Sequence, residues 1–377
     1  MRGGPPGDLP GELPGGLPGN LPGKPGGRDR SLRRSRIGLY GPFAVLAVLA
    51  IAWTAAWFVI RDRTRAGIDE WVGAEAASGR RWSCADRAFG GYPFRLEVRC
   101  ANLTVERPDV HVSLGRLLVV SQVYRPRHVI AEASGPLRIE AGPTRVDGRW
   151  RLLQASAVTS DGGLDRLSLV VEAPTATMAD PGAPPGAPPL EFSSRRFEAH
   201  LRPEPAQEGT YDLALRTDAA VIPGLDELVG GTEPADLAAS LDVTQASDLP
   251  ARPLWSELER WRIAGGRVNL ASLTMAKGAR RAEAKGAVGI DELHRPEGRL
   301  DISAAGLGGL LGRFATGSGI GGALIGAILG TPGPESRPAP RAGADAALKP
   351  LPPLRLEGGR LYVGPLPIPG VRLPVLY

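Results

Sequence analysis

An unbroken apolar run near the N-terminus constrains the fold of this chain more than any other feature. Residues 37–60 read IGLYGPFAVLAVLAIAWTAAWFVI, 24 residues without a charged side chain. At about 1.5 Å of helix per residue, such a run is longer than the roughly 30 Å hydrocarbon core of a bilayer. A cleaved signal peptide would have an apolar region of only about 7 to 15 residues. We therefore predict a transmembrane helix over residues 37–60.

Basic residues lie unequally on the two sides of this run and predict its orientation. Six Lys or Arg residues lie between Lys24 and Arg36, whereas three follow the run, at Arg61, Arg63 and Arg65. Positive side chains close to a span tend to stay in the cytoplasm. The sequence thus predicts a single-pass membrane protein, with a cytoplasmic N-terminus and most of the chain on the other side of the membrane.

The segment ahead of the run, residues 1–36, is rich in Pro and Gly and repeats Leu-Pro-Gly four times. Such a repeat forms neither a helix nor a core, so we predict a disordered, basic cytoplasmic tail. The tail is a solvated segment, a partner-binding segment or an extension from a misplaced start codon, and these alternatives stay open. It carries +4 of the formal net charge of +5. The rest of the chain is nearly neutral, so we expect no nucleic-acid partner.

The hydrophobic period changes after the run. In residues 61–79, Ile68, Val72 and Ala76 are spaced as on one face of a helix, which predicts a juxtamembrane helix that ends at Gly79. From residue 80 to residue 377 the pattern is largely that of strands, and it is clearest in residues 94–100, where apolar and charged side chains alternate. Similar short runs occur at residues 103–106, 110–114, 117–121, 129–133, 137–140, 167–171, 196–201, 211–216, 282–290, 354–356 and 361–363.

These strands are separated by turn residues and by a few other segments. We predict helices over residues 225–241 and 253–264, an exposed Pro-rich loop over 174–189, and a Gly/Pro-rich segment over 317–353. The predicted fold class is mainly β (α+β). The transmembrane helix is followed by curved antiparallel sheet, open or half-barrel, with a few packed helices.

Two cysteines, Cys84 and Cys100, are the only thiols of the chain, and both follow the predicted span. An oxidising compartment favours a disulfide between them. A redox or metal site is the alternative, but the pair lacks C-x-x-C spacing and a neighbouring His. We find no motif of a hydrolase, a phosphate-binding loop or a zinc protease, so we predict no catalytic residue, no metal and no cofactor.

One stretch resembles a known family. Trp82-Ser83-Cys84, followed by GGYPFRLEVRC over residues 90–100, is similar to the signature of a bacterial family catalogued as domain of unknown function 2125. Residues 356–367 and the single N-terminal span also look like that family. The resemblance covers roughly residues 37–377. It implies a single-pass protein of the bacterial inner membrane, with a cytoplasmic N-terminus and most of the chain in the periplasm, and it offers no catalytic residue to carry over.

At a second level, residues 265–309 and 110–139 look like the strand modules of AsmA-like envelope proteins. That resemblance implies a curved, incompletely closed sheet with an apolar trough that handles lipid. Independently of the name, strands with a continuous aliphatic face need a cover, which is either a helix or a lipid chain.

We therefore expect a non-enzymatic envelope protein that binds phospholipid or another apolar ligand. The candidate ligand face consists of Tyr92, Phe94, Leu96, Val98 and Leu103. For the segment from Gly91 to Phe94, a purely structural turn is the alternative to a ligand lip. A scaffolding protein that acts through envelope partners is the main alternative function. An envelope hydrolase, which would need carboxylates or a Ser/His pair in a cleft, is a third.

Overall fold

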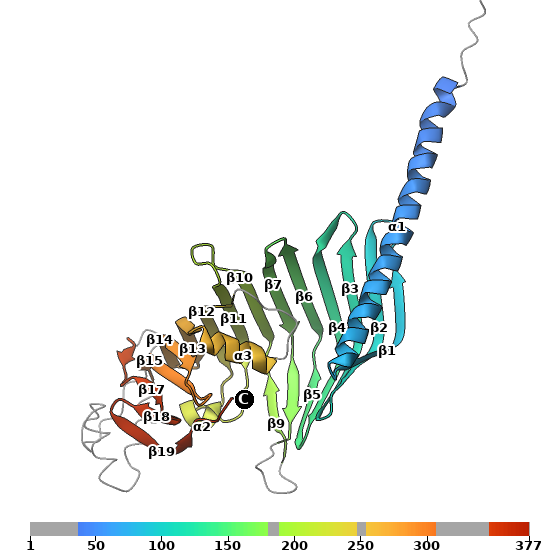
Figure 1. Ribbon diagram of the computed structural model, residues 1–377. Helices are drawn as coiled ribbons and strands as arrows, with labels where there is room; N and C mark the ends of the chain where they lie inside the picture. The colour runs from blue at the N-terminus through green and yellow to red at the C-terminus, as the bar shows by residue number, and fades with distance from the viewer. Residues whose placement is uncertain (1–36, 180–187, 247–253, 307–346, 377) are drawn as a thin grey trace, which may run out of the picture. The chain divides into compact units, whose positions relative to one another are not determined.

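The computed structural model describes residues 37–179, 188–246, 254–306 and 347–376 (Figure 1). The chain divides into two compact units, residues 1–52 and 53–377, and each is considered by itself. The described part of the first unit is helical and forms the beginning of α1 (Ile37–Ala77). The predicted tail over residues 1–36 lies outside the described residues.

Helix α1 contains the whole apolar run and is long and apolar enough to cross a membrane once. The transmembrane segment expected over residues 37–60 continues into the juxtamembrane segment expected over 61–79, and the two form one helix of 41 residues. It ends where Ser78 donates from its backbone N–H to the Ala74 carbonyl at 3.1 Å, and Gly79 then takes a left-handed conformation with φ 82°. Glycine adopts that conformation without a steric cost, so the end of the helix is encoded locally.

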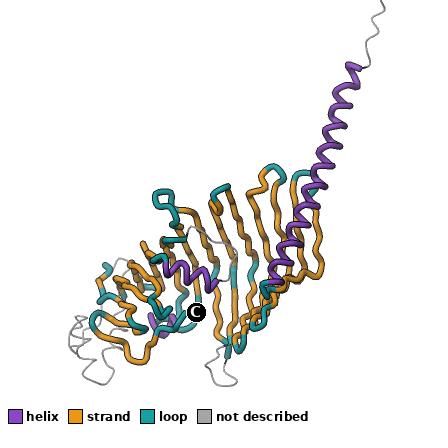
Figure 2. Tube along the Cα trace, viewed as in Figure 1, coloured by secondary structure: helices purple, strands orange, loops and turns teal. Residues whose placement is uncertain are grey.

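The second unit is built mainly from strands, as Figure 2 shows. The described strands form one open sheet and every pairing is antiparallel. Their bounds are β1 Arg81–Gly90, β2 Arg95–Glu106, β3 Val110–Gln122, β4 Arg125–Ala141, β5 Thr144–Arg149, β6 Leu152–Ser160, β7 Gly163–Glu172, β8 Thr175–Met178, β9 Leu190–Ser193, β10 Arg196–Pro203, β11 Tyr211–Ala220, β12 Ala235–Val243, β13 Val268–Lys277, β14 Arg280–Ile290, β15 Pro296–Ala305, β16 Lys349–Pro350, β17 Leu354–Glu357, β18 Arg360–Val363 and β19 Leu366–Arg372.

The sheet is close to a simple meander. Its main series runs β1–β2–β3–β4–β6–β7–β10–β11–β12–β13–β14–β15–β17–β18–β19. Strand β4 is long enough to pair with β6 along one half and with β5 along the other, and β5, β8 and β9 continue as a branch. The strand at β16 pairs with β15. Antiparallel neighbours joined by short turns explain why the alternating pattern of the sequence is preserved over so many strands.

Several neighbouring runs in the sequence prove to be single strands. The predicted runs 94–100 and 103–106 both belong to β2, runs 110–114 and 117–121 to β3, and runs 129–133 and 137–140 to β4. The predicted helix over 253–264 is confirmed as α3 (Leu254–Ile263), and the hairpin around residues 354–363 is confirmed as β17 and β18.

Two predictions are wrong. The helix expected over 225–241 stops after α2 (Leu225–Val229), because Gly230 and Gly231 both have φ 78°, and residues 235–243 form β12. Leu237 and Leu241 are four residues apart, a spacing that fits a helix and a strand equally well. The loop expected over 174–189 contains β8, so its first part is a strand, while residues 180–187 lie outside the described residues. The predicted segment 317–353 is described only from residue 347 onward.

Candidate functional site

One face of the sheet is aliphatic across almost all of its width, and the strand register shows this directly. Residues directly opposite each other on neighbouring strands point to the same face. One row of such pairs runs through Val98, Val119, Ala131, Ala155, Leu169, Ala199, Leu215, Ala239, Leu273, Ala284 and Ile302. With about 4.8 Å per strand step, this row is roughly 50 Å long.

Two parallel rows widen the same surface. The first consists of Cys100, Leu117, Ala133, Leu153, Val171, Phe197, Thr217, Leu237, Met275, Ala282 and Ala304. The second consists of Leu96, Ser121, Val129, Ala157, Leu167, Leu201, Leu213, Leu241, Leu270, Gly286 and Leu300. We call these three rows the apolar face. The sequence-predicted residues Leu96 and Val98 belong to it.

The intervening residues form the opposite face, which is mainly polar and which we call the polar face; its large apolar exceptions include Leu118, Val120, Ile130 and Val170. The polar face includes ion pairs along single strands, such as Arg196 with Glu198 at 2.5 Å and Arg299 with Asp301 at 3.0 Å. Two Ser–His hydrogen bonds of 3.0 Å also lie there, between His128 Nε2 and Ser156 Oγ and between His200 Nδ1 and Ser168 Oγ. A sheet with one apolar and one polar face needs a cover only on the apolar side.

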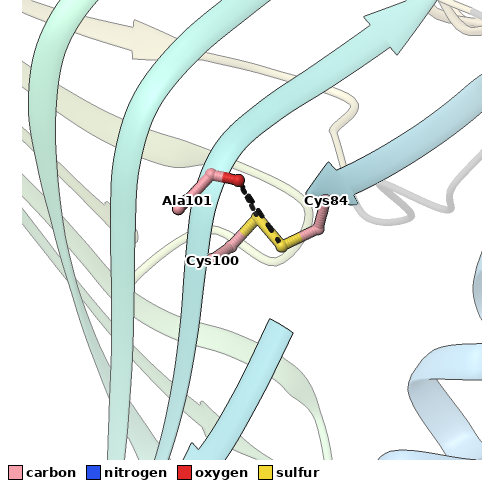
Figure 3. Close-up of a disulfide and its surroundings, with 3 residues drawn as sticks. All are labelled: Cys84, Cys100 and Ala101. Atoms are coloured by element: carbon pink, nitrogen blue, oxygen red, sulfur yellow. Dashed lines mark hydrogen bonds between the residues drawn. A yellow bond between two sulfur atoms is a disulfide. The ribbon is translucent and has the colours of Figure 1, made fainter. Parts of the chain in front are cut away.

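The disulfide Cys84–Cys100, which the sequence predicted, joins β1 to β2 (Figure 3). Its Cα atoms are 5.7 Å apart, and the Ala101 carbonyl oxygen lies 3.9 Å from the Cys100 sulfur. The bond also settles where Leu103 points. Cys84 is directly opposite Leu103, so those two share a face, and the disulfide places Cys100 on that face too. Asn102, with φ 53°, interrupts the alternation and lets Cys100 and Leu103 both lie on the apolar side.

At one end of the apolar face, α1 covers the sheet through ion pairs and hydrogen bonds as well as through aromatic contacts. Arg87, directly opposite Cys100, is ion-paired with Asp69 of α1, and the rings of Trp71 and Trp82 are 5.1 Å apart. Glu75 accepts hydrogen bonds from the Arg80 guanidinium at 2.5 and 2.6 Å and from the Trp82 indole at 3.2 Å.

These contacts also set the charge of Glu75. The hydrogen bonds from Arg80 lower the pKa of Glu75, partial burial opposes them, and the Trp82 hydrogen bond adds to the lowering. The carboxylate therefore stays ionised, and α1 is held against β1 by ionic as well as aromatic contacts.

The far end of the apolar face lies under α3, where a groove of about 580 Å³ remains. Its floor includes Val243, Val268 and Val288, which are directly opposite one another and extend the apolar face by one row. Its wall includes Leu258 and Trp261 of α3. The Trp261 indole donates to the Thr244 carbonyl at 2.6 Å, which fixes the ring over the sheet. The volume lies within the roughly 300–1,000 Å³ of small-molecule sites.

Polar groups mark the rim of the groove. Glu257 pairs through Oε2 with Arg260, while its Oε1 is buried without a hydrogen-bond partner. The β14–β15 turn follows the lining residue Ile290 and is not itself part of the lining. Burial there raises the pKa of Asp291, but hydrogen bonds from Arg295 and from the Leu293 N–H outweigh it, so the pKa is lowered. The groove therefore combines an aliphatic floor with a charged opening.

Between α1 and α3, the apolar face of the sheet is only half-buried. Leu167 is 37% exposed, and its row neighbours Ala157, Leu201 and Leu213 are of intermediate burial. Within the described ranges, the buried apolar side chains are Trp57, Cys100, Val171, Ala220, Ala235, Ala304 and Ala305. A closed core of this width would bury the large residues of all three rows. The described part of the chain thus leaves the middle of the face without a full cover.

The remaining predicted residues, Tyr92 and Phe94, lie in the turn between β1 and β2 and contact α1 instead of the rows. The alternation over 94–100 was the signal for the β2 part of the face. No comparable sequence pattern marks the groove, because Trp261, Val288 and Leu376 line it together only through the fold. Among the described residues, no group of three or more His, Cys, Asp or Glu side chains is placed to hold a metal.

Comparison with known proteins identifies a family for most of the chain. The model of a family described as an uncharacterized protein conserved in bacteria (DUF2125) matches residues 57–371, which is well over half of the chain. The search of curated proteins and the search of solved structures give no match.

Proposed function

The chain belongs to the DUF2125 family of bacterial proteins, and from this premise we propose that it is a non-enzymatic, single-pass protein of the inner membrane that binds lipid in the periplasm. The acyl chains lie along the apolar face, and the groove under α3 accommodates one end of the ligand. The observation that carries the proposal is the three-row apolar face, which is aliphatic from β2 to β15 and incompletely covered by the described residues.

Three features favour lipid over other apolar ligands. The roughly 50 Å length of the rows suits extended chains better than a compact molecule. The one apolar helix found among the described residues fits membrane association and would keep the sheet near a source of lipid. The resemblance of the strand modules to AsmA-like proteins, drawn from the sequence, points to the same ligand class.

The test is to count phospholipids bound to matched variants of the full-length protein. Leu169→Glu with Leu215→Glu places two charges in one row of the apolar face, and Ser168→Glu with Ala214→Glu places two charges in the adjacent row of the polar face. After exchange into a phosphate-free detergent, lipid phosphorus per protein is measured. Lipid around α1 is common to all samples, so the difference between variants reports on the sheet.

We expect the apolar-face variant to lose bound phospholipid, and the polar-face variant to retain the wild-type amount. Equal lipid in both variants, with both folded by circular dichroism, would exclude lipid binding by the sheet. In that case a scaffolding function through protein partners becomes the better explanation.

A further inference from the structure

The turn between β1 and β2 is bound to the part of α1 that lies inside the apolar run. The Trp53 indole donates to the Pro93 carbonyl at 2.9 Å, and the Trp57 indole donates to the Arg95 carbonyl at 2.9 Å. The Thr54 and Tyr92 hydroxyls are 2.8 Å apart, and the Trp57 and Tyr92 rings meet edge to face at 5.5 Å. Trp57 itself is only 4% exposed, so this contact is a packed one.

These contacts fix the level of the turn along α1. About 20 helical residues cross the hydrocarbon core, so a span that begins at residue 37 ends near Trp53 and Trp57. Tryptophans at the end of a span sit at the boundary between acyl chains and headgroups. Because both indoles hydrogen-bond the turn, the turn lies at that same boundary.

The exposed side chains of this end of the sheet suit that position. Tyr92 is 54% exposed and Phe94 59% exposed. The β3–β4 turn joins them through the hydrogen bond from Val123 N–H to the Phe94 carbonyl at 3.0 Å, and its Tyr124 is 62% exposed. Three large aromatic side chains exposed on adjacent turns are costly in water and favourable in the interface of a bilayer.

Arginines lie beyond these aromatic residues, at Arg61 and Arg65 on the following turns of α1. The Arg61 guanidinium lies 4.8 Å from the centre of the Phe58 ring. Arg61, Arg65 and Arg87 surround a hollow of about 230 Å³, with Phe89 as its apolar wall. Aromatic rings at the inner level and basic groups one or two helical turns beyond it match the order of acyl chains and phosphates in a leaflet.

We propose that the β1–β2 and β3–β4 turns insert Tyr92, Phe94 and Tyr124 into the interface of the membrane leaflet from which α1 emerges. The sheet is then anchored at two places, by the span and by its own edge. Leu96 and Val98 are the first β2 residues of the apolar face, so the apolar face then starts next to the acyl chains. This proposal rests on α1 spanning the membrane, and it does not depend on lipid binding by the rest of the sheet.

The test is the depth of a fluorophore attached to single added cysteines in the full-length protein. Cys84 and Cys100 are joined to each other, so an added thiol is the reactive one. Tyr124→Cys and Arg125→Cys report on the inserted turn. Asp109→Cys, in the exposed turn at the other end of β2, is the matched control. Each labelled protein is placed in phosphatidylcholine vesicles with and without brominated acyl chains.

We expect the Tyr124 and Arg125 labels to show blue-shifted emission that brominated lipid largely quenches. The Asp109 label should emit as in water and be unaffected by bromine. Emission as in water from both turn labels, in protein that is vesicle-bound and retains its strand content, would overturn the proposal. Because bilayer depth and phospholipid count are separate measurements, failure of this proposal is distinguishable from failure of the proposed function.

Discussion

The two helices that cover the apolar face, α1 and α3, leave different amounts of space beneath them. At the α1 end, the helix is joined to β1 by the Asp69–Arg87 ion pair, by the hydrogen bond from the Trp82 indole to Glu75, and by the contact of the Trp71 and Trp82 rings. At the α3 end, the Trp261 indole hydrogen bond and a contact of 3.1 Å between Glu259 and His294 of the β14–β15 turn hold the helix over a groove of about 580 Å³. The difference indicates that α1 is packed against the sheet, whereas α3 covers the sheet with a groove left beneath it.

The largest effect is expected from the disulfide beneath α1. A loop closed by residues 16 apart restricts the unfolded chain and contributes about 3 kcal/mol in the chain-entropy model. The double variant Cys84→Ala with Cys100→Ala should lower the free energy of unfolding by about that amount in denaturant titrations of the oxidised protein. Stability equal to that of the wild type would show that the α1 end does not depend on this bond.

A smaller effect is expected at the α3 end, where Gly266 faces the Trp261 indole. A Cβ at residue 266 would collide with the ring, so Gly266→Ala should displace Trp261 and cost about 1 kcal/mol. Gly289→Ala is the matched control, because its added Cβ would meet neighbours at 3.6 Å, an ordinary contact. Tryptophan fluorescence and thermal unfolding of both variants provide the measurement. Equal behaviour of the two glycine variants would mean that Trp261 is mobile, and that the groove is not a formed site.

The smallest effect is a pH dependence at the α1 end. The folded pKa of Glu75 lies below its usual value of 4.5, so the Glu75–Arg80 contact stabilises the fold above that pH and is lost as the pH falls below it. The melting temperature should decrease on acidification from pH 6 toward pH 3. The melting temperature of the Glu75→Gln variant should decrease less over the same range, since this variant has no carboxylate at residue 75 to protonate. Identical changes of melting temperature with pH in the wild type and in Glu75→Gln would show that the Glu75–Arg80 contact does not contribute to stability.

The sequence predicted the elements of this protein better than their arrangement. The alternation in residues 94–100 identified β2, because charged and apolar side chains differ strongly there. Strand β12 was missed because Leu237 and Leu241 suit either period, and Ala155, Ala199 and Ala239 carry little periodic signal. The apolar face depends on pairings such as Leu169 with Ala199, which the sequence does not specify locally. The groove depends on α3 and Leu376, far apart in the sequence, lining the same space.

The most direct measurement of lipid binding is photo-crosslinking at two consecutive residues of one strand whose side chains point to opposite faces of the sheet. A benzophenone amino acid at Leu215 lies on the apolar face, and the same probe at Arg216 lies on the polar face of the same strand. After irradiation of intact cells, the mass of the adduct identifies what touches each position. We predict a phospholipid adduct at residue 215 and none at residue 216. A protein adduct at residue 215, or crosslinks only within the chain itself, would contradict lipid binding by the apolar face.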